Sequence, residues 1–526
     1  MSAFQPLPRL QECIKPQEDD TVTESTAIYE SCDEDESTAI CESIEDEHID
    51  SVRRPPKRPP AIPLRGVVQH YAWGKPSETS IVAHMATEQV RASQGPMKAP
   101  PMSRGNKFAE LWMGTHPNGH SSVILPQRRG DPGPDLLRKP FSKPYNVSRK
   151  LMQIQEDSCI SSDEEETHEW FLGDIIEQDP TFWLGKEEAR RRNIPFLLKV
   201  LSVRQALSIQ AHPNKKLAEE LHRTCPGHYP DGNHKPEICI PLGHFEALCG
   251  FRPVGDVRRH VSEVPELRRL VQLDEEEVTS ASLQDMFSRL MKADSVQQTN
   301  QVVALVNRLK DIVDPDRDQK LILRISQDYP MDVGIFSVYF LNYVVITEDM
   351  PNRFIYCAPD EPHAYLCGDA VECMAMSDNV VRAGLTQKFK DVDTLLRMMT
   401  WRDDLLDELV NVGERVQAHV VKYNPPVEDF MLYEVDGPVP DGIVLTRASI
   451  VACISGRFVV DFRSLVANDR GDSDGKTAEI FAGADVPFSW RGEKKIIKGN
   501  TFFSRAGTEL IVKSARENSR LFIATY

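Results

Sequence analysis

The chain has 526 residues and a formal net charge of −18, with 80 acidic against 62 basic side chains. That balance argues against a nucleic-acid-binding protein, which shows a basic face, and the longest apolar run, residues 333–346, is too short to span a membrane. The N-terminus has no basic region followed by an apolar one, so we expect no signal peptide. The eleven cysteines form no C-x-x-C pair, so we expect reduced thiols in a cytoplasmic protein.

Residues 1–60 are an acidic segment. The first 50 residues hold fifteen Asp and Glu against Arg9 and Lys15. Such a composition cannot bury enough apolar surface to offset the entropy of ordering, so we predict a disordered tail. Within it, E-S-T-A-I-Y-E-S (24–31) recurs as E-S-T-A-I-C-E-S (36–43). The repeat indicates low complexity or, alternatively, a phosphorylation or interaction element that binds a protein partner.

Short strands separated by Gly and Pro are predicted over residues 61–253, with one interruption. Residues 126–169 are rich in Pro, Arg and Ser and end near the acidic run S-S-D-E-E-E (161–166). Connections of this length are usually functional or disordered, and we predict a disordered insertion.

Residues 254–332 follow a helical period instead. The apolar residues that recur on single helix faces are Leu283, Met286, Phe287, Leu290, Met291, Val302, Leu305, Val306 and Leu309. Strand patterns return over 333–400 and 401–526, as in the stretch 442–462. We therefore predict a mainly β protein, built of antiparallel sandwiches and interrupted by an all-helical domain.

Four residues have the donor atoms and local spacing of a divalent metal site. Gln210 and His212 are two apart in the run A-L-S-I-Q-A-H-P (206–213), so both side chains leave one face of a strand. Glu237 ends N-H-K-P-E (233–237), and His363 lies in E-P-H-A-Y-L (361–366). Two imidazoles, one carboxylate and one amide oxygen suit Zn²⁺ with a position left for water or substrate.

Each of these residues alone has an ordinary explanation. A single buried histidine is more often a hydrogen-bonded core residue than a ligand, and Glu237 alone would be a solvated acid. Nothing in the pattern makes ligands of His228, His234 or His244. The conjunction of four donors favours the metal site.

The stretches around these donors resemble the type I mannose-6-phosphate isomerases, also called phosphomannose isomerases. The matching motifs are Q-H-Y-A-W-G-K (69–75), F-A-E-L-W-M-G-T-H-P (108–117), P-F-L-L-K-V-L-S-V (195–203), L-S-I-Q-A-H-P-N-K (207–215), H-K-P-E (234–237), F-E-A-L-C-G-F-R-P (245–253), E-P-H-A-Y-L-C-G-D (361–369) and S-D-N-V-V-R-A-G-L-T-Q-K-F-K-D-V (377–392). The resemblance covers residues 65–125 and 170–400 well and the C-terminal part loosely.

The resemblance implies two cupin-type jelly rolls and an inserted all-α domain. Residues 61–253 and 333–400 would form a catalytic jelly roll, 254–332 the helical domain and 401–526 the second jelly roll. It further implies one Zn²⁺ per chain and the interconversion of mannose 6-phosphate and fructose 6-phosphate, which feeds GDP-mannose synthesis.

Aldose–ketose isomerisation needs a base that moves a proton between C2 and C1. The candidates are Glu372, Lys199, Lys235 and Asp378, or a hydroxide on the metal, and the sequence does not rank them. Lys199 is flanked by apolar residues, and a charge there is expensive to bury without a partner, so we expect it to point into the pocket.

The substrate's phosphate requires a cation. Arg382 occupies the position of the family's active-site arginine, and its planar fork suits phosphate or a developing oxyanion. Lys388 and Ser208 are further substrate-binding candidates.

Two rival functions remain open. An Fe²⁺ oxygenase on a cupin fold would favour His-rich or two-His-one-carboxylate sets, and Gln210 argues against it. A catalytically silent paralogue that senses sugar phosphate would have no need of Lys199, Lys235, Glu372 and Arg382 together.

Overall fold

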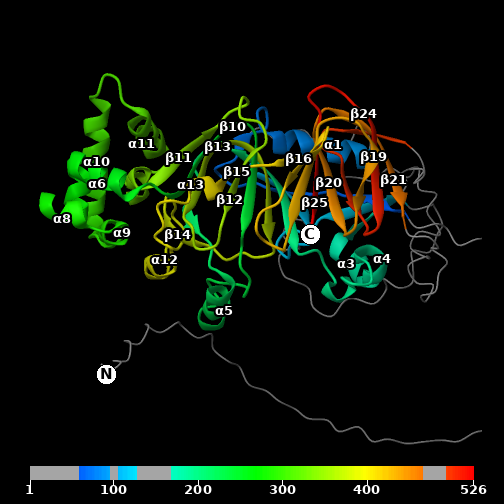
Figure 1. Cartoon of the computed structure of the whole chain (residues 1–526), viewed down its shortest axis with the longest axis horizontal. Coiled ribbons are helices and arrows are strands. Elements are labelled where there is room, and N and C mark those ends of the chain that lie inside the picture. The colour runs from blue at the N-terminus through cyan, green and yellow to red at the C-terminus, as the bar shows by residue number, and fades with distance from the viewer. Residues whose placement is uncertain (1–58, 95–104, 127–166, 466–492) are drawn as a thin grey trace, which may run out of the picture. The chain divides into compact units, whose positions relative to one another are not determined.

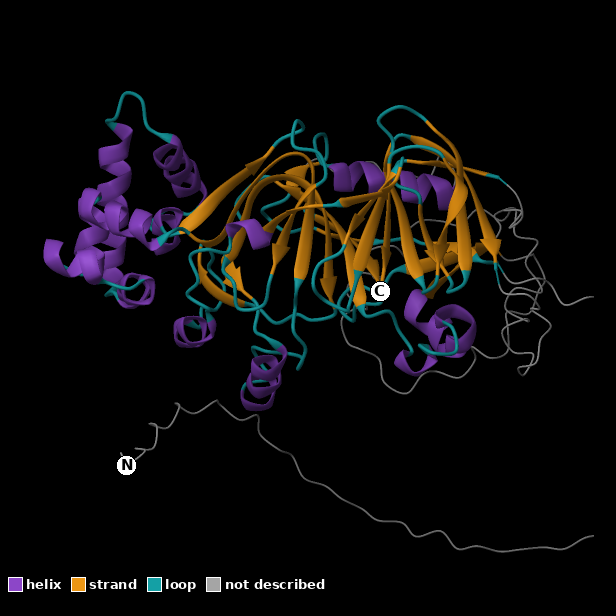
Figure 2. Cartoon of the chain, viewed as in Figure 1, coloured by secondary structure: helices purple, strands orange, loops and turns teal. Residues whose placement is uncertain are grey.

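The computed structural model describes residues 59–94, 105–126, 167–465 and 493–526, all within the second of two units, residues 55–526. Residues 1–58 of the predicted tail and 127–166 of the predicted insertion lie outside the described residues. The prediction of disorder is wrong for the margins of the insertion, because Pro126 and residues 167–169 belong to two paired strands. In the described part, no helix is long and apolar enough to cross a membrane. The structure confirms the predicted fold class: strands form most of it, and helices gather beyond one end of the sheets (Figure 2).

A ten-stranded sheet forms the first jelly roll. Seven of its strands are hydrogen-bonded in the order β15 (Val410–Val412), β12 (Arg353–Cys357), β10 (Glu237–Phe251), β13 (His363–Ala375), β8 (Phe196–Val203), β5 (Glu110–Gly114) and β2 (Val67–Gln69). In addition, β11 (Leu341–Ile346) pairs with β10, β9 (Ile209–Ala211) pairs with β13, and β14 (Val381–Gly384) pairs with β9. All recorded pairings are antiparallel, so neighbouring strands present opposing residues to the same face.

The helical domain interrupts this sheet between β10 and β11 (Figure 1). It comprises α6 (Val254–Glu263), α7 (Pro265–Val271), α8 (Glu275–Ser280), α9 (Leu283–Lys292), α10 (Ser295–Lys310) and α11 (Arg317–Asp328), followed by the 3₁₀ turn η3 (Val333–Tyr339). Most apolar residues that recur with helical spacing are buried in α9 and α10. Arg324 of α11 donates to Glu246 of β10 at 3.0 Å, which ties the domain to the sheet.

The second jelly roll consists of a seven-stranded and a four-stranded sheet. The first contains β1 (Ala61–Pro63), β23 (Thr501–Ser504), β20 (Ser449–Ser455), β25 (Arg520–Thr525), β18 (Met431–Val435), β17 (Val420–Tyr423) and β16 (Glu414–Gln417). The second contains β19 (Val439–Leu445), β24 (Thr508–Ala515), β21 (Arg457–Ser464) and β22 (Lys494–Ile497).

The remaining elements connect or cover the sheets. They are the pairs β3 (Lys75–Pro76) with β4 (Lys107–Phe108) and β6 (Ser122–Pro126) with β7 (Thr167–Phe171), the helices α1 (Ile81–Gln94), α3 (Leu172–Gln178), α4 (Pro180–Leu184), α5 (Lys215–Thr224), α12 (Val392–Met398) and α13 (Leu406–Leu409), and the turn η2 (Ala189–Arg191).

The predicted domain limits differ from the structure at both margins. β1, placed by the sequence in the first jelly roll, pairs with β23 of the C-terminal sheet, while β15, placed in the second, pairs with β12 of the first. Alternating hydrophobicity identifies a strand but not its partner, because pairing partners are chosen by packing far along the chain.

The two jelly rolls share a core, and this decides which way the central strand β8 faces. Phe196, Leu198 and Val200 lie in one cluster with C-terminal residues such as Ile450 and Phe503. The alternate residues of β8, including Lys199, therefore face the interior of the first jelly roll.

Gly368 lies inside β13, the strand that begins at His363. Its φ of +121° is disfavoured for other residues, and an added Cβ would lie 2.5 Å from the backbone oxygen of His244. We expect Gly368→Ala to lower the free energy of unfolding by about 2 kcal/mol or more, because strain and a backbone clash add. A fall in the urea midpoint of unfolding measures this.

The control is Gly255→Ala in α6, where an added Cβ meets nothing within 4 Å. Alanine there should leave the midpoint unchanged or raise it, since Gly in a helix is about 0.5–1 kcal/mol less favourable than Ala. Equal midpoints for the two variants would contradict the assigned role of Gly368.

Candidate active site

One face of the central strands carries a row of ionisable side chains. Lys199 on β8 lies directly opposite Glu372 on β13. Glu110 on β5 and Glu237 on β10 have the register that places them on the same face. All four side chains are buried, so this interior is polar in the middle of an otherwise apolar sheet.

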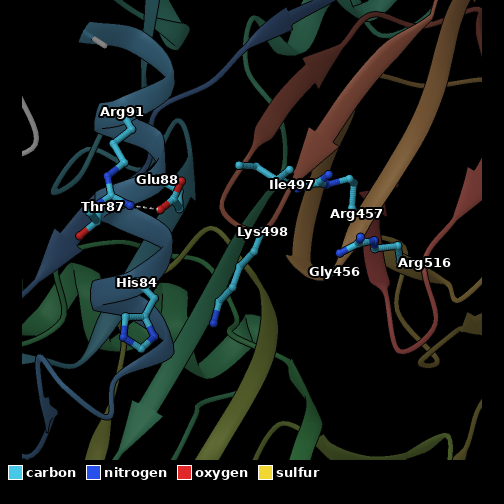
Figure 3. Close-up of a pocket in the computed structure, with 9 residues that line it drawn as sticks. All are labelled: His84, Thr87, Glu88, Arg91, Gly456, Arg457, Ile497, Lys498 and Arg516. Atoms are coloured by element: carbon cyan, nitrogen blue, oxygen red, sulfur yellow. Dashed lines mark hydrogen bonds and ion pairs between the residues drawn. The ribbon is translucent and has the colours of Figure 1, made fainter. Parts of the chain in front are cut away.

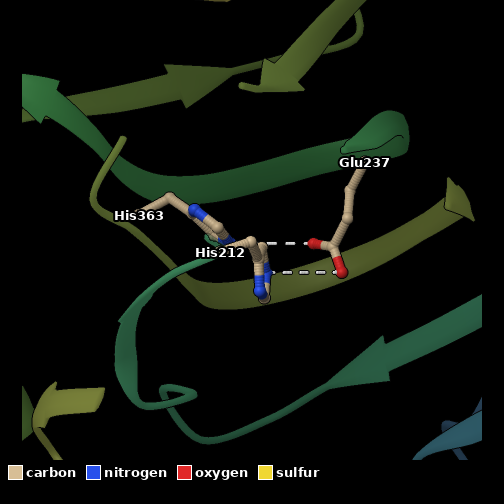
Figure 4. A group of neighbouring side chains, drawn as sticks. All are labelled: His212, Glu237 and His363. Atoms are coloured by element: carbon tan, nitrogen blue, oxygen red, sulfur yellow. Dashed lines mark ion pairs between the residues drawn. The ribbon is translucent and has the colours of Figure 1, made fainter. Parts of the chain in front are cut away.

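His212, Glu237 and His363 converge next to this row (Figure 4). His212 follows β9, Glu237 begins β10 and His363 begins β13. The Nε2 atoms of His212 and His363 lie 3.5 and 3.6 Å from the two carboxylate oxygens of Glu237. The side-chain amide of Gln210 approaches His363 Nε2 to 3.4 Å. The structure thus brings the four predicted ligands together from three distant stretches of chain.

Backbone carbonyls orient both imidazoles. Nδ1 of His212 lies 2.9 Å from the carbonyl oxygen of Asn379, and Nδ1 of His363 lies 3.3 Å from that of Glu361. A proton on each Nδ1 leaves the Nε2 lone pairs aimed at Glu237, the arrangement typical of metal-bound histidines.

Two of the atoms in this group that could bind a metal are buried and have no hydrogen-bond partner. They are His212 Nε2 and Glu237 Oε2. A buried polar atom without a partner costs about 1–3 kcal/mol, and a metal ion between the side chains would satisfy both. Two imidazoles and a carboxylate form a known catalytic zinc set, so the residues fit zinc.

Burial and the charge of Glu237 act in opposite directions on the two imidazoles. Burial lowers the pKa of His212 to about 4, so its imidazole is neutral at pH 7. Burial opposes ionisation of Glu237, but Lys235 and His212 hold its pKa well below the usual range. Burial also opposes the charge on His363, but Cys357 and Glu237 raise its pKa to about 10. Glu237 therefore stabilises positive charge beside it.

A second group of donors lies elsewhere on β10 and β13. His244, Glu246 and Cys367 are close enough to share an ion. However, both oxygens of Glu246 already accept from Arg324, and Tyr343 donates to one of them. No buried side-chain nitrogen or oxygen of His244 or Glu246 lacks a hydrogen-bond partner, so the group of His212, Glu237 and His363 is the better metal site.

Three of the proposed bases lie beside the metal group. Lys199 Nζ donates to Glu372 at 2.8 Å, and Lys235 Nζ lies 3.1 Å from Glu237. Burial opposes the charge on Lys199, but the carboxylates of Glu372 and Glu110 raise its pKa. Burial raises the pKa of Glu372 to about 7 against the effect of Lys199. Glu372 can therefore exchange a proton near neutral pH.

The fourth candidate base, Asp378, is already bound to other side chains. It lies 3.3 Å from Nε2 of His116 and accepts from the amide of Asn118 at 2.6 Å. These two contacts, with burial opposing, hold its pKa below the usual range. Asp378 is a weaker base than Glu372 on this account.

Arg382 lies on β14 directly opposite Gln210. Burial lowers its pKa, and no acid in the described ranges forms an ion pair or hydrogen bond with its guanidinium. Lys388 is close enough that, besides partial burial, the charge of Arg382 lowers its pKa. Ser208 Oγ lies 3.4 Å from Gln210 Oε1. A partly buried, unpaired arginine beside the metal group is a ready anion site.

The sequence interpretation missed two residues of this region. Glu110 lies 4.0 Å from Lys199 Nζ and accepts from Trp112, and Tyr365 is buried with its hydroxyl 3.4 Å from Cys357 Sγ. The signal for Glu110 was present, since it is an acid at the head of a buried apolar strand, as Lys199 is a cation within one.

Comparisons with known proteins match this geometry. The family description "Phosphomannose isomerase type I, catalytic domain" matches residues 62–138 and 155–254, and "Phosphomannose isomerase type I, helical insertion domain" matches 260–341. Mannose-6-phosphate isomerase of Homo sapiens is 36% identical over 423 residues, covering 76% of this chain and 89% of the human protein. Mannose-6-phosphate isomerase 2 of Arabidopsis thaliana is 34% identical and covers 83% and 91%.

Solved structures are similar over most of the chain. An alanine mutant of phosphomannose isomerase from Salmonella typhimurium aligns with a TM-score of 0.63 and 25% identity, over 88% of this chain and 99% of that one. A mannose 6-phosphate isomerase bound with zinc and yttrium aligns with the same TM-score, identity and coverage.

Proposed function

The chain belongs to the type I phosphomannose isomerases, and from this premise we propose that it interconverts mannose 6-phosphate and fructose 6-phosphate by proton transfer between C1 and C2. It is an enzyme of the isomerase class, as its relatives are. We further propose that it works in the cytoplasm and supplies mannose 6-phosphate for GDP-mannose synthesis.

Zinc is the expected cofactor, which the zinc-bound neighbours and the His/Glu/His group confirm. Gln210, His212, Glu237 and His363 would hold it. The ligand atoms of the two histidines and Glu237 converge, and two of them have no hydrogen-bond partner. The side chain of Gln210 lies beside His363, with its amide nitrogen 3.4 Å from His363 Nε2. The chemistry that bound zinc supplies is Lewis acidity toward the substrate's oxygens, worth several kcal/mol in the transition state.

Proton transfer is assigned to the residues that border this group. Glu372 has a pKa near neutrality, which suits a group that takes a proton from one carbon and returns it to the other. The 2.8 Å contact with Lys199 orients its carboxylate. Lys235 stays a second candidate, held through its contact with Glu237.

Substrate anchoring is assigned to Arg382, with Lys388 and Ser208 beside it. The guanidinium has no protein partner in the described ranges, so a substrate anion would be its counter-ion. Its two parallel N–H groups match phosphate or a developing oxyanion.

His212 Nε2 and Glu237 Oε2, which are buried and have no hydrogen-bond partner, carry this proposal and weigh against the silent paralogue. A sugar-phosphate sensor would need the cations alone. It would not need two imidazoles and a carboxylate that converge in a buried position.

A coupled assay tests the function. The purified chain is given mannose 6-phosphate, and fructose 6-phosphate is measured with zinc, after removal of zinc by a chelator, and after zinc is restored. We expect turnover, its loss and its recovery. A chain that contains zinc but makes no product would support the silent paralogue, and turnover in a zinc-free chain would overturn the metal assignment.

A further inference from the structure

A cavity of about 580 Å³ lies between helix α1 and the turns at the ends of β21, β22 and β24 in the second jelly roll (Figure 3). His84, Thr87, Glu88 and Arg91 line it from α1. The other wall belongs to the C-terminal strands. None of the residues assigned to the active site lines this cavity.

The C-terminal wall is strongly cationic. Arg457, Lys498 and Arg516 all line the cavity, and none has an acidic ion-pair partner in the described part of the chain. The one carboxylate of the lining, Glu88, is paired with Arg91 at 2.5 Å. The lining thus carries three uncompensated positive charges in a protein whose net charge is −18.

Lys498 lies between the two walls (Figure 3). Partial burial lowers the pKa of its ammonium group, and the charges of Asp369 and Cys453 offset this only in part. A half-buried cation without a close counter-ion is destabilising by itself. An anion in the cavity would remove that penalty.

The walls hold these cations in a defined arrangement. The backbone N–H of Arg516 donates to the carbonyl of Arg457 at 2.9 Å, which keeps the two arginines adjacent. On the other side, a Cβ at Gly499 would lie 2.8 Å from the backbone oxygen of Met85. The turn that carries Lys498 is therefore packed directly on α1.

We propose that this cavity is a second anion site, which binds a polyphosphate group such as that of a nucleoside diphosphate. The neighbouring residues Arg457 and Arg516 offer two guanidinium groups to phosphate oxygens, and Lys498 adds a further positive charge to the lining of the same cavity. The volume lies within the range of small-molecule sites, and Ile497 offers an apolar wall for the organic part of a ligand.

The experiment measures binding of inorganic pyrophosphate and of ADP to the zinc-loaded full chain by calorimetry. It is done in an Arg382→Ala background, which removes the arginine of the active-site anion position, and zinc content is checked afterwards. The test variant is Lys498→Ser. Its matched control is Lys495→Ser, which removes the same charge from an exposed position of β22, the strand that Lys498 follows, and which does not line the cavity.

We expect saturable binding that Lys498→Ser weakens about tenfold or more and Lys495→Ser leaves within about twofold. Arg516→Ser, at an exposed residue, should also weaken it about tenfold with an unchanged melting temperature. Tighter binding of ADP than of pyrophosphate would assign the site to a nucleotide, and equal binding to polyphosphate alone. No saturable binding of either ligand, or equal loss in both lysine variants, would overturn the proposal.

Discussion

Glu237→Gln should lose both zinc and turnover while the chain stays folded. Glutamine keeps the size of the side chain but removes the only carboxylate among the four proposed ligands. The anionic oxygens that lie 3.5 and 3.6 Å from the two imidazoles disappear, so the site no longer balances a divalent charge. Elemental analysis should find little zinc, and the coupled assay should find turnover reduced by about 10³-fold or more.

The matched control is Glu372→Gln, the same replacement on the same face of the sheet. Glu372 is paired with Lys199 and is not placed among the ligands. Its variant should keep zinc and still lose turnover, because the proposed proton carrier is gone. A zinc-loaded and active Glu237→Gln variant would contradict the ligand assignment.

Arg382→Ala should leave zinc stoichiometry unchanged and lower kcat by about 10²-fold or more. The guanidinium contacts no acid in the described residues, so its charge is free for the substrate, and a contact that strengthens in the transition state acts on kcat. Steady-state kinetics and elemental analysis on one preparation measure both quantities.

Arg397→Ala is the control for this variant. Arg397 is an exposed arginine that pairs with Glu220 at 3.4 Å on the surface, and its loss should change neither quantity. A normal kcat with only a raised KM in Arg382→Ala would mean that Arg382 binds the ground-state phosphate and takes no part in the transition state.

The parts of the fold and of the candidate site that depend on local residue spacing could be predicted from the sequence. Leu283, Met286, Phe287 and Leu290 repeat at helical intervals, and the structure buries all four in α9. The two-residue spacing of Gln210 and His212 predicted that both side chains leave one face of an extended chain, and in the structure Gln210 lies next to His363 and His212 next to Glu237.

The parts that depend on distant pairing could not be predicted in this way. Residues 61–63 read as a strand, but their partner β23 begins more than 400 residues later. Glu110 is an acid in a buried strand, yet only the register of β5 against β8 puts it near Lys199. Arg457 begins β21 and Lys498 follows β22, so the two cations do not belong to one sequence motif.

The most direct test of the proposed zinc site is the anomalous scattering of a crystal of the zinc-loaded chain, measured above and below the zinc absorption edge. One peak should lie within bonding distance of His212 Nε2, His363 Nε2, Glu237 and Gln210, at about 2.0–2.2 Å from the nitrogens and the carboxylate oxygen. A peak at His244, Glu246 and Cys367 instead, or no peak in crystals of an active and zinc-replete preparation, would contradict the account.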